Sequence, residues 1–154
     1  MQDAAAIADI WNAMIRDTLA TFTTHEISYA EIAEMITSRP GAFWVVQSDY
    51  IQGFATFGPF RKGPGYAATA EHTVILSAKA QGLGFGPALM MQLEGEAQTQ
   101  GIHVLVAGIS SANPGAVTFH RRLGFHQTDE MAQVGRKAGH WIDLILMQKI
   151  ISAS

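Results

Sequence analysis

Apolar side chains recur at helical spacing near the start of the chain, where one stripe runs from Ile7 through Met14 to Ile15 and Asp3 can cap it. Proline and glycine mark the ends of three further stretches with helical character. The pattern therefore predicts four helices: one that follows Asp3, and three at residues 29–38, 87–100 and 114–123.

Runs rich in β-branched and aromatic residues lie between these helices and predict strands. They cover residues 43–47, 53–60, 71–76, 103–109, 127–134 and 141–148, and residues 48–50 join the first two as a hairpin. The run at 103–109 is almost continuously apolar, which is typical of a strand buried on both faces. Since no repeat or linker divides the chain, the alternation of strands and helices predicts one layered α/β domain over residues 1–154.

Composition excludes several classes of function. Ten Lys and Arg against thirteen Asp and Glu give a net charge of −3, which lacks the basic surplus of proteins that bind a nucleic-acid backbone. The chain has no cysteine, and its histidines show no spacing typical of metal ligands. The apolar runs are too short to span a bilayer, and no basic residue precedes Arg16 as it would in a secretory signal. We therefore expect a cytoplasmic protein without a metal, nucleic-acid or membrane partner.

The segment Gln81-Gly82-Leu83-Gly84-Phe85-Gly86-Pro87 lies between a predicted strand and a predicted helix. Its three glycines let backbone N–H groups turn toward one point, and a helix N-terminus adds further donors, an arrangement suited to phosphates. A glycine-rich turn without a ligand is the alternative. Neither a P-loop nor a dinucleotide motif fits the spacing. Gly86 borders the helix start, so we expect it to lie outside the core.

The pattern Gln81-x-x-Gly84-x-Gly86 resembles the (Q/R)xxGx(G/A) pyrophosphate loop of the GCN5-related N-acetyltransferase (GNAT) superfamily. The segments Glu71-His72-Thr73-Val74, Val106-Ala107-Gly108-Ile109 and residues 134–144 look like its phosphinothricin and methionine sulfoximine acetyltransferase branch. The resemblance implies an α/β GNAT fold, in which a mixed, twisted sheet is flanked by helices. It also implies that the strands at 71–76 and 103–109 splay apart where acetyl-CoA binds, and that the protein is a homodimer.

Three features depart from the family pattern. The chain enters its first helix within three residues, so the first family strand is expected to be missing, either because the start is truncated or because the sheet lacks an edge strand. Leu83 and Pro87 stand where basic residues are frequent, so the pyrophosphate depends more on backbone donors. Ala67 follows Tyr66 where the branch often has arginine, which weakens the transfer of amino-acid carboxylate recognition.

The resemblance also assigns residues to the donor site and to the chemistry. Glu71 is implied as the general base and His120 as the acid that protonates the departing thiolate, although a surface carboxylate and a helix-face histidine are the plain alternatives. Asn113 is implied as a cofactor contact, and N-capping of the following helix is an equally physical role. Acetyl-CoA, the co-substrate, is implied to bind the backbone of Val74, Ile75 and Leu76 and the loop formed by Gln81, Gly82, Leu83, Gly84, Phe85 and Gly86.

For the acceptor we expect contacts from Phe22, Arg61, Tyr66 and His72. The Arg61 guanidinium matches a carboxylate, but a solvated loop arginine is an alternative, and His72 either orients the substrate or simply packs. The predicted reaction moves an acetyl group from acetyl-CoA to the α-amine of a small amino acid or analogue, such as methionine sulfoximine, methionine sulfone or phosphinothricin. Acetylation of another small amine or of a protein N-terminus, and a non-catalytic acyl-CoA sensor, are the alternatives.

Overall fold

A computed structural model describes residues 3–152. Its helices are α1 (Ala4–Asp17), α2 (Tyr29–Ser38), α3 (Phe85–Thr99) and α4 (Pro114–Arg122). Its strands are β1 (Phe43–Gln47), β2 (Ile51–Pro59), β3 (Thr69–Leu76), β4 (Val104–Ser110), β5 (His126–Lys137) and β6 (His140–Ile150). Two short 3₁₀ helices, Pro64–Tyr66 and Ala78–Ala80, lie in the connections. None of the helices in residues 3–152 is both long and apolar enough to cross a membrane.

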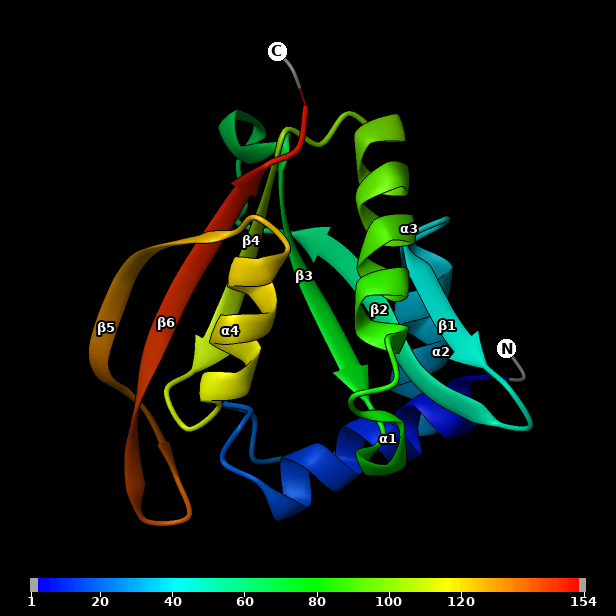
Figure 1. Cartoon of the computed structure of the whole chain (residues 1–154), viewed down its shortest axis with the longest axis vertical. Helices are drawn as coiled ribbons and strands as arrows, with labels where there is room; N and C mark the ends of the chain where they lie inside the picture. Colours follow the sequence, from blue (N-terminus) through cyan, green and yellow to red (C-terminus); the bar gives the residue numbers. More distant parts are fainter. Residues whose placement is uncertain (1–2, 153–154) are drawn as a thin grey trace.

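The strands form one mixed sheet in the order β1-β2-β3-β4-β6-β5. Neighbouring strands are antiparallel except β3 and β4, which are parallel and pair only from Thr69 to Glu71. Beyond Glu71 the two strands diverge, as Figure 1 shows toward the lower end of the molecule. The expected splay between these strands is confirmed.

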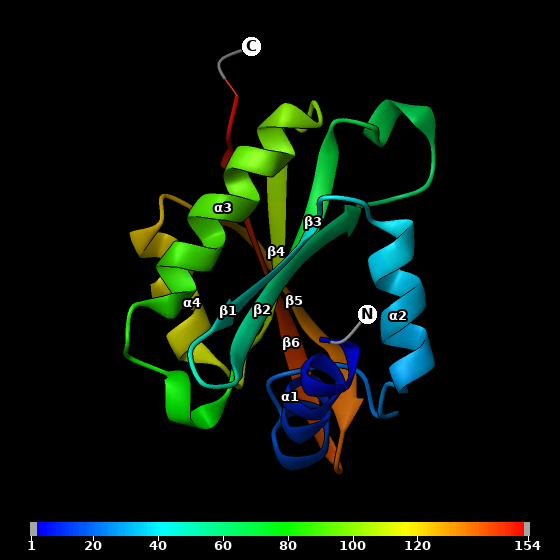
Figure 2. The same cartoon turned by 90° about the vertical axis from the view of Figure 1, so that its right-hand side faces the viewer.

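Helices cover both faces of the sheet (Figure 2). On one face, α3 packs against β1, β2 and β3, and its side chains Leu89, Met90, Leu93 and Ala97 belong to the larger apolar core. On the other face, α1 and α2 bury Ile7 and Ile32 against Phe54 and Ile75. Because side chains alternate along a strand, β2 and β3 contribute to both cores at once.

Most predicted elements are present, and their differences in length have local causes. The helix at 29–38 and the strand at 43–47 have the predicted bounds. Helix α3 begins two residues early because Gly84, in a left-handed conformation at φ 83°, precedes Phe85. Strand β5 extends to Lys137 because it pairs with β6 through two register shifts. The expected lack of a first strand falls on residues 1–2, outside the described residues.

A capping box fixes the start of α2. The Ser28 side chain accepts a hydrogen bond from the Glu31 N–H at 3.1 Å, and the Glu31 carboxylate accepts one from the Ser28 N–H at 2.7 Å. Two N–H groups that a helix start leaves unpaired are satisfied in this way. The reciprocal bonds determine where α2 begins and therefore where its other end reaches the sheet.

We expect Ser28→Ala to lower the free energy of unfolding by about 1 kcal/mol, because the Glu31 N–H loses its acceptor. Ser38→Ala is the matched control at the other end of α2, where the hydroxyl only donates to the Met35 carbonyl. Urea denaturation of both variants measures the difference. Equal losses in the two variants would contradict a specific role of the cap.

Candidate active site

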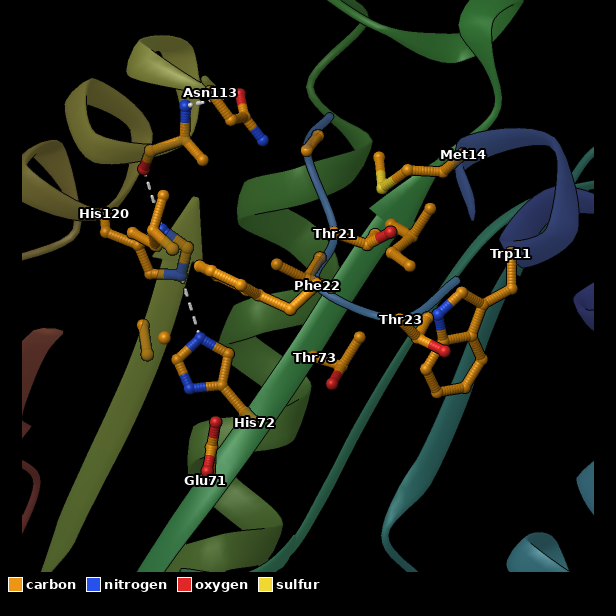
Figure 3. A pocket seen from close by; sticks show the side chains of 17 residues that line it. Trp11, Met14, Thr21, Phe22, Thr23, Glu71, His72, Thr73, Asn113 and His120 are labelled. Carbon is orange, nitrogen blue, oxygen red and sulfur yellow. Dashed lines mark hydrogen bonds between the residues drawn. The ribbon is translucent and has the colours of Figure 1, made fainter. Parts of the chain in front are cut away.

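Two cavities occupy the region where β3 and β4 separate. The inner cavity, of about 240 Å³, is lined by residues 71–75 of β3, residues 107–109 of β4, and side chains from α1, α4 and the loop after α1 (Figure 3). The glycine-loop cavity, of about 320 Å³, extends along β3 to Gln81, Gly82 and Gly86. The two form one continuous cleft because they share Met14, Val74, Ile75, Asn113, Ala116 and His120.

The glycine loop has the backbone geometry expected of an anion site. Gly82 and Gly84 adopt φ angles of 79° and 83°, which favour glycine, and no atom lies within 4 Å of a Cβ added at either position. No side chain caps the N-terminus of α3, so its first N–H groups are left for a ligand. Gln81 and Leu83 are exposed beside them, and Phe85 is half-buried.

Gly86 has a different role from its neighbours. It is buried, and a Cβ there would lie 2.7 Å from the ring of Phe119 on α4. The expectation that Gly86 lies outside the core is therefore wrong. A contact across 33 positions of sequence, which the local pattern does not reveal, requires glycine at this point of α3.

The edge of β3 that faces the cleft lacks a strand partner after Glu71. Pairing with β4 ends at the Glu71–Val106 pair, whereas pairing with β2 continues to Leu76. Backbone groups of Val74, Ile75 and Leu76 on that edge can therefore bond an extended ligand in place of a strand. The predicted donor residues of β3 thus line the same cleft as Gln81, Gly82 and Gly86 of the glycine loop, whereas Leu83, Gly84 and Phe85 are not part of its lining.

Glu71 stands at the point where the strands part (Figure 3). Its carboxylate lies over Gly108 of β4, with Oε2 3.1 Å from the position that a Cβ of Gly108 would occupy. Glu71 is exposed as a residue, yet the walls around its carboxylate desolvate it in part, and this desolvation raises the pKa of Glu71. A carboxylate with a raised pKa is a stronger base than one with the ordinary pKa.

The two histidines of the site form a buried pair. His72 and His120 approach each other with their Nε2 atoms 2.8 Å apart, and His120 Nδ1 lies 2.8 Å from the Ala116 carbonyl (Figure 3). A carbonyl oxygen only accepts, so neutral His120 donates from Nδ1 and must accept at Nε2. His72 therefore donates from Nε2, and its Nδ1 is a lone pair with no hydrogen-bond partner among the described residues. The Phe125 ring packs against both imidazoles.

Burial keeps this pair neutral. Desolvation, with the nearby His120 as a second cause, lowers the pKa of His72 to about 3, and desolvation also lowers the pKa of His120. In this state His120 has no N–H free for a leaving group, since one nitrogen donates to Ala116 and the other accepts from His72. The predicted role of His120 as an acid therefore requires its charged form.

Asn113 caps a helix and also lines the cleft. Its side-chain oxygen accepts a hydrogen bond from the Ala116 N–H at 3.2 Å and so caps α4. The same residue lines both cavities, where its amide faces the shared part of the cleft (Figure 3).

The loop after α1 closes one side of the inner cavity, and buried polar groups hold it there. The Ser110 hydroxyl donates to the Leu19 carbonyl at 2.6 Å, and the Lys137 ammonium donates to the Thr21 hydroxyl at 2.9 Å. Phe22 enters the cavity with its ring against Gly135, where a Cβ would overlap it. Sequence reasoning found Phe22 but missed Ser110 and Lys137, whose partners lie far away along the chain.

Two of the other predicted acceptor residues, Arg61 and Tyr66, lie apart from Phe22. Arg61 and Tyr66 line a third cavity of about 360 Å³, which also contains Arg39. Both pack on Phe60: the Arg61 guanidinium lies 5.2 Å from the ring centroid, and the Tyr66 ring meets it edge-on. His72 lines the inner cavity, yet its ring is directed toward α4. No group of three His, Asp or Glu side chains within residues 3–152 could hold a metal ion.

Comparison with known proteins agrees with this geometry. Residues 7–125 match the sequence model of the acetyltransferase (GNAT) family. The chain is 37% identical over 150 residues to the L-amino acid N-acyltransferase MnaT of Escherichia coli, which covers 95% of this chain and 87% of that protein. It is 36% identical over 155 residues to an L-methionine sulfoximine/L-methionine sulfone acetyltransferase of Salmonella typhimurium, with coverages of 95% and 88%. The structure of a phosphinothricin acetyltransferase from Sinorhizobium meliloti in complex with acetyl-CoA is similar at a TM-score of 0.91 and 29% identity, over 97% of this chain and 83% of that one.

The buried histidine pair predicts a pH dependence of stability. Unfolded His72 binds a proton near pH 6.5, whereas the folded protein resists it down to about pH 3, so its stability contribution is present above pH 6.5 and is lost as the pH falls. We expect His72→Gln to reduce the slope of unfolding free energy against pH by about one proton between roughly pH 6.5 and 5. Urea denaturation over that range measures the slope.

His25→Gln is the matched control for this experiment, because His25 is exposed on the loop after α1. Its profile should follow that of the wild type. A His72→Gln profile parallel to the wild type would contradict the assignment of a neutral, buried His72.

Proposed function

Because the chain belongs to the acetyltransferase (GNAT) family, we propose that it acetylates the α-amine of a small amino acid or analogue of the methionine sulfoximine, methionine sulfone or phosphinothricin type. The predicted family and fold are confirmed, and the protein is an acetyl-CoA-dependent N-acetyltransferase. The observation that carries the proposal is the continuous cleft, which has Glu71 at one end and the glycine loop at the other.

In this proposal acetyl-CoA lies along the cleft with its pyrophosphate at the glycine loop and its thioester toward Glu71. The N–H groups around Gly82 and Gly84 and at the start of α3 would bind the pyrophosphate. The unpaired edge of β3 at Val74–Leu76 would bond the pantetheine arm, and Asn113 would contact the cofactor beside it. The thioester then lies near Glu71, where the inner cavity begins.

The proposed reaction is a direct transfer. Glu71, or a water bound to it, takes a proton from the acceptor ammonium, and the free amine attacks the thioester carbonyl carbon. A backbone N–H of β3 stabilises the oxyanion of the tetrahedral intermediate. When the C–S bond breaks, the amide forms and the CoA thiolate takes a proton. We assign this proton to His120, which must first gain it against the desolvation that keeps the resting pair neutral. No cysteine is present to carry the acetyl group on the protein.

The inner cavity favours a small acceptor over a protein N-terminus. Its volume is about 240 Å³, and the loop after α1 is held across it by bonds from Ser110 and Lys137. Phe22 and His72 would contact the acceptor there, and Arg61 and Tyr66 would reach it from the neighbouring cavity. A peptide acceptor would require this loop to leave its partners.

A single domain over residues 1–154, a homodimer and a cytoplasmic location complete the proposal. Exposed apolar side chains of β5 and β6, namely Met131, Val134 and Trp141, support the dimer. The location rests on the sequence argument alone.

A thiol-release assay with acetyl-CoA and a panel of acceptors tests the proposed function. The panel contains amino acids, methionine sulfone and sulfoximine, phosphinothricin, simple primary amines and a peptide with a free N-terminus. Turnover restricted to the amino acids and their analogues supports the proposal. Turnover with the peptide or the simple amines alone would refute it.

We expect Glu71→Gln to lower kcat by roughly 10²–10⁴ at pH 7 with little change in acetyl-CoA affinity, because the amide cannot accept the proton. The loss should shrink as the pH approaches the pKa of the acceptor amine, where free amine is already abundant. Steady-state rates over a pH series measure both effects. Glu34→Gln, at an exposed position on α2, is the matched control. Full activity of Glu71→Gln at pH 7 would exclude Glu71 as the general base.

We expect Gly84→Val to weaken acetyl-CoA binding at least tenfold, or about 1.4 kcal/mol, because a β-branched residue disfavours the left-handed backbone that aims the N–H groups. Gly95→Ala is the control in the same helix, since nothing lies within 4 Å of its added Cβ. Calorimetry gives both affinities, and circular dichroism checks the fold. An unchanged acetyl-CoA affinity in Gly84→Val would contradict the role of the glycine loop as the pyrophosphate site.

A further inference from the structure

Arg39 is a half-buried cation that the mechanism above does not use. It is the first residue after α2, and its side chain lies on the sheet over Gly58, where an added Cβ would be 2.7 Å from the guanidinium carbon. Its only side-chain hydrogen bond is one from Nη1 to the Thr56 hydroxyl at 3.3 Å, and it makes no ion pair within residues 3–152. A guanidinium has five N–H donors, so most of those of Arg39 have no partner among residues 3–152.

The register of the sheet places this cation beside the proposed base. Gly58 of β2 pairs directly with Glu71 of β3. Side chains of such a pair point to the same face, with Cβ atoms roughly 5 Å apart. The Arg39 guanidinium therefore occupies the place of the side chain that Gly58 lacks, opposite Glu71.

Glu71 leans away from Arg39, toward Gly108 on the next strand. The guanidinium over β2 and the carboxylate over β4 are thus separated by about two strand spacings, or roughly 10 Å. An α-amino acid carries its ammonium and its carboxylate on the same carbon, the α-carbon. With a charge-assisted hydrogen bond of about 2.8 Å at each end, it can bridge this separation.

The cavity at Arg39 has the charge of an anion site. Arg39 and Arg61 both line it, and no Asp or Glu does. The two cavities share no lining residue, but this one contains Gly58 and Ala70, which are the strand partner and the preceding residue of Glu71 in the inner cavity. We propose that Arg39 binds the α-carboxylate of the acceptor in the cavity that it shares with Arg61, with the amine directed at Glu71. The inference rests on the proposed amino-acid acceptor.

The test compares L-methionine sulfone, or the best amino acid of the panel above, with its primary amide, which keeps the amine but lacks the carboxylate. Arg39→Gln should raise KM for the amino acid roughly 10- to 100-fold and leave kcat and the KM for acetyl-CoA near the wild type. KM for the amide should not change. Arg39→Lys, which keeps the charge but loses the planar fork, should recover part of the affinity.

Thr56→Val is the matched control, because it removes the hydrogen-bond partner of Arg39 and keeps the guanidinium. If Arg39 only ties α2 to β2, both Arg39→Gln and Thr56→Val lower the melting temperature and neither changes KM for the acid selectively. In folded Arg39→Gln or Arg39→Lys, an unchanged KM for the amino acid, or equal increases in KM for the acid and its amide, would overturn this inference. The proposed acceptor class would still stand. Wild-type turnover of amines but of no amino acid would refute the proposed acceptor class, and this inference with it.

Discussion

The site depends on the point at which β3 and β4 stop exchanging hydrogen bonds. Parallel pairing ends at Glu71, and helices cover both faces of the sheet there, so the free edge of β3 lies at the bottom of a cleft. Backbone groups in such a place need partners, and an extended ligand supplies them where a strand does not. The same divergence leaves Glu71 at the head of the cleft.

The separation is maintained by side chains that fill the space behind it. His72 points from β3 to His120 on α4, and Phe125 packs against both rings. In this apolar setting the neutral pair leaves only the Nδ1 lone pair of His72 without a partner among the described residues, whereas a charged pair would have to be desolvated as well. The two imidazoles in this wall of the cleft therefore have fixed tautomers, set by their hydrogen bonds, and burial keeps them uncharged in the resting protein.

Local signals predicted much of this structure. The stop at residues 39–41 set the end of α2, and the glycine loop was visible from its spacing. Contacts between distant segments could not be predicted from the sequence. Gly86 packs on Phe119, and Arg61 shares a cavity with Arg39. Nothing in the residues around Arg39 reveals that its side chain crosses β2 at the position opposite Glu71, because register is a property of the folded sheet.

The contact of Gly86 with Phe119 has a consequence for how these positions can vary. The Phe119 ring fills the space beside Gly86 that a side chain at position 86 would need. A larger residue at 86 therefore becomes tolerable only when the residue at 119 is smaller. The two positions are constrained as a pair, and substitutions tested one at a time would classify each as intolerant. Since Phe119 is adjacent to His120, drift at this pair would also shift the imidazole relative to the cleft.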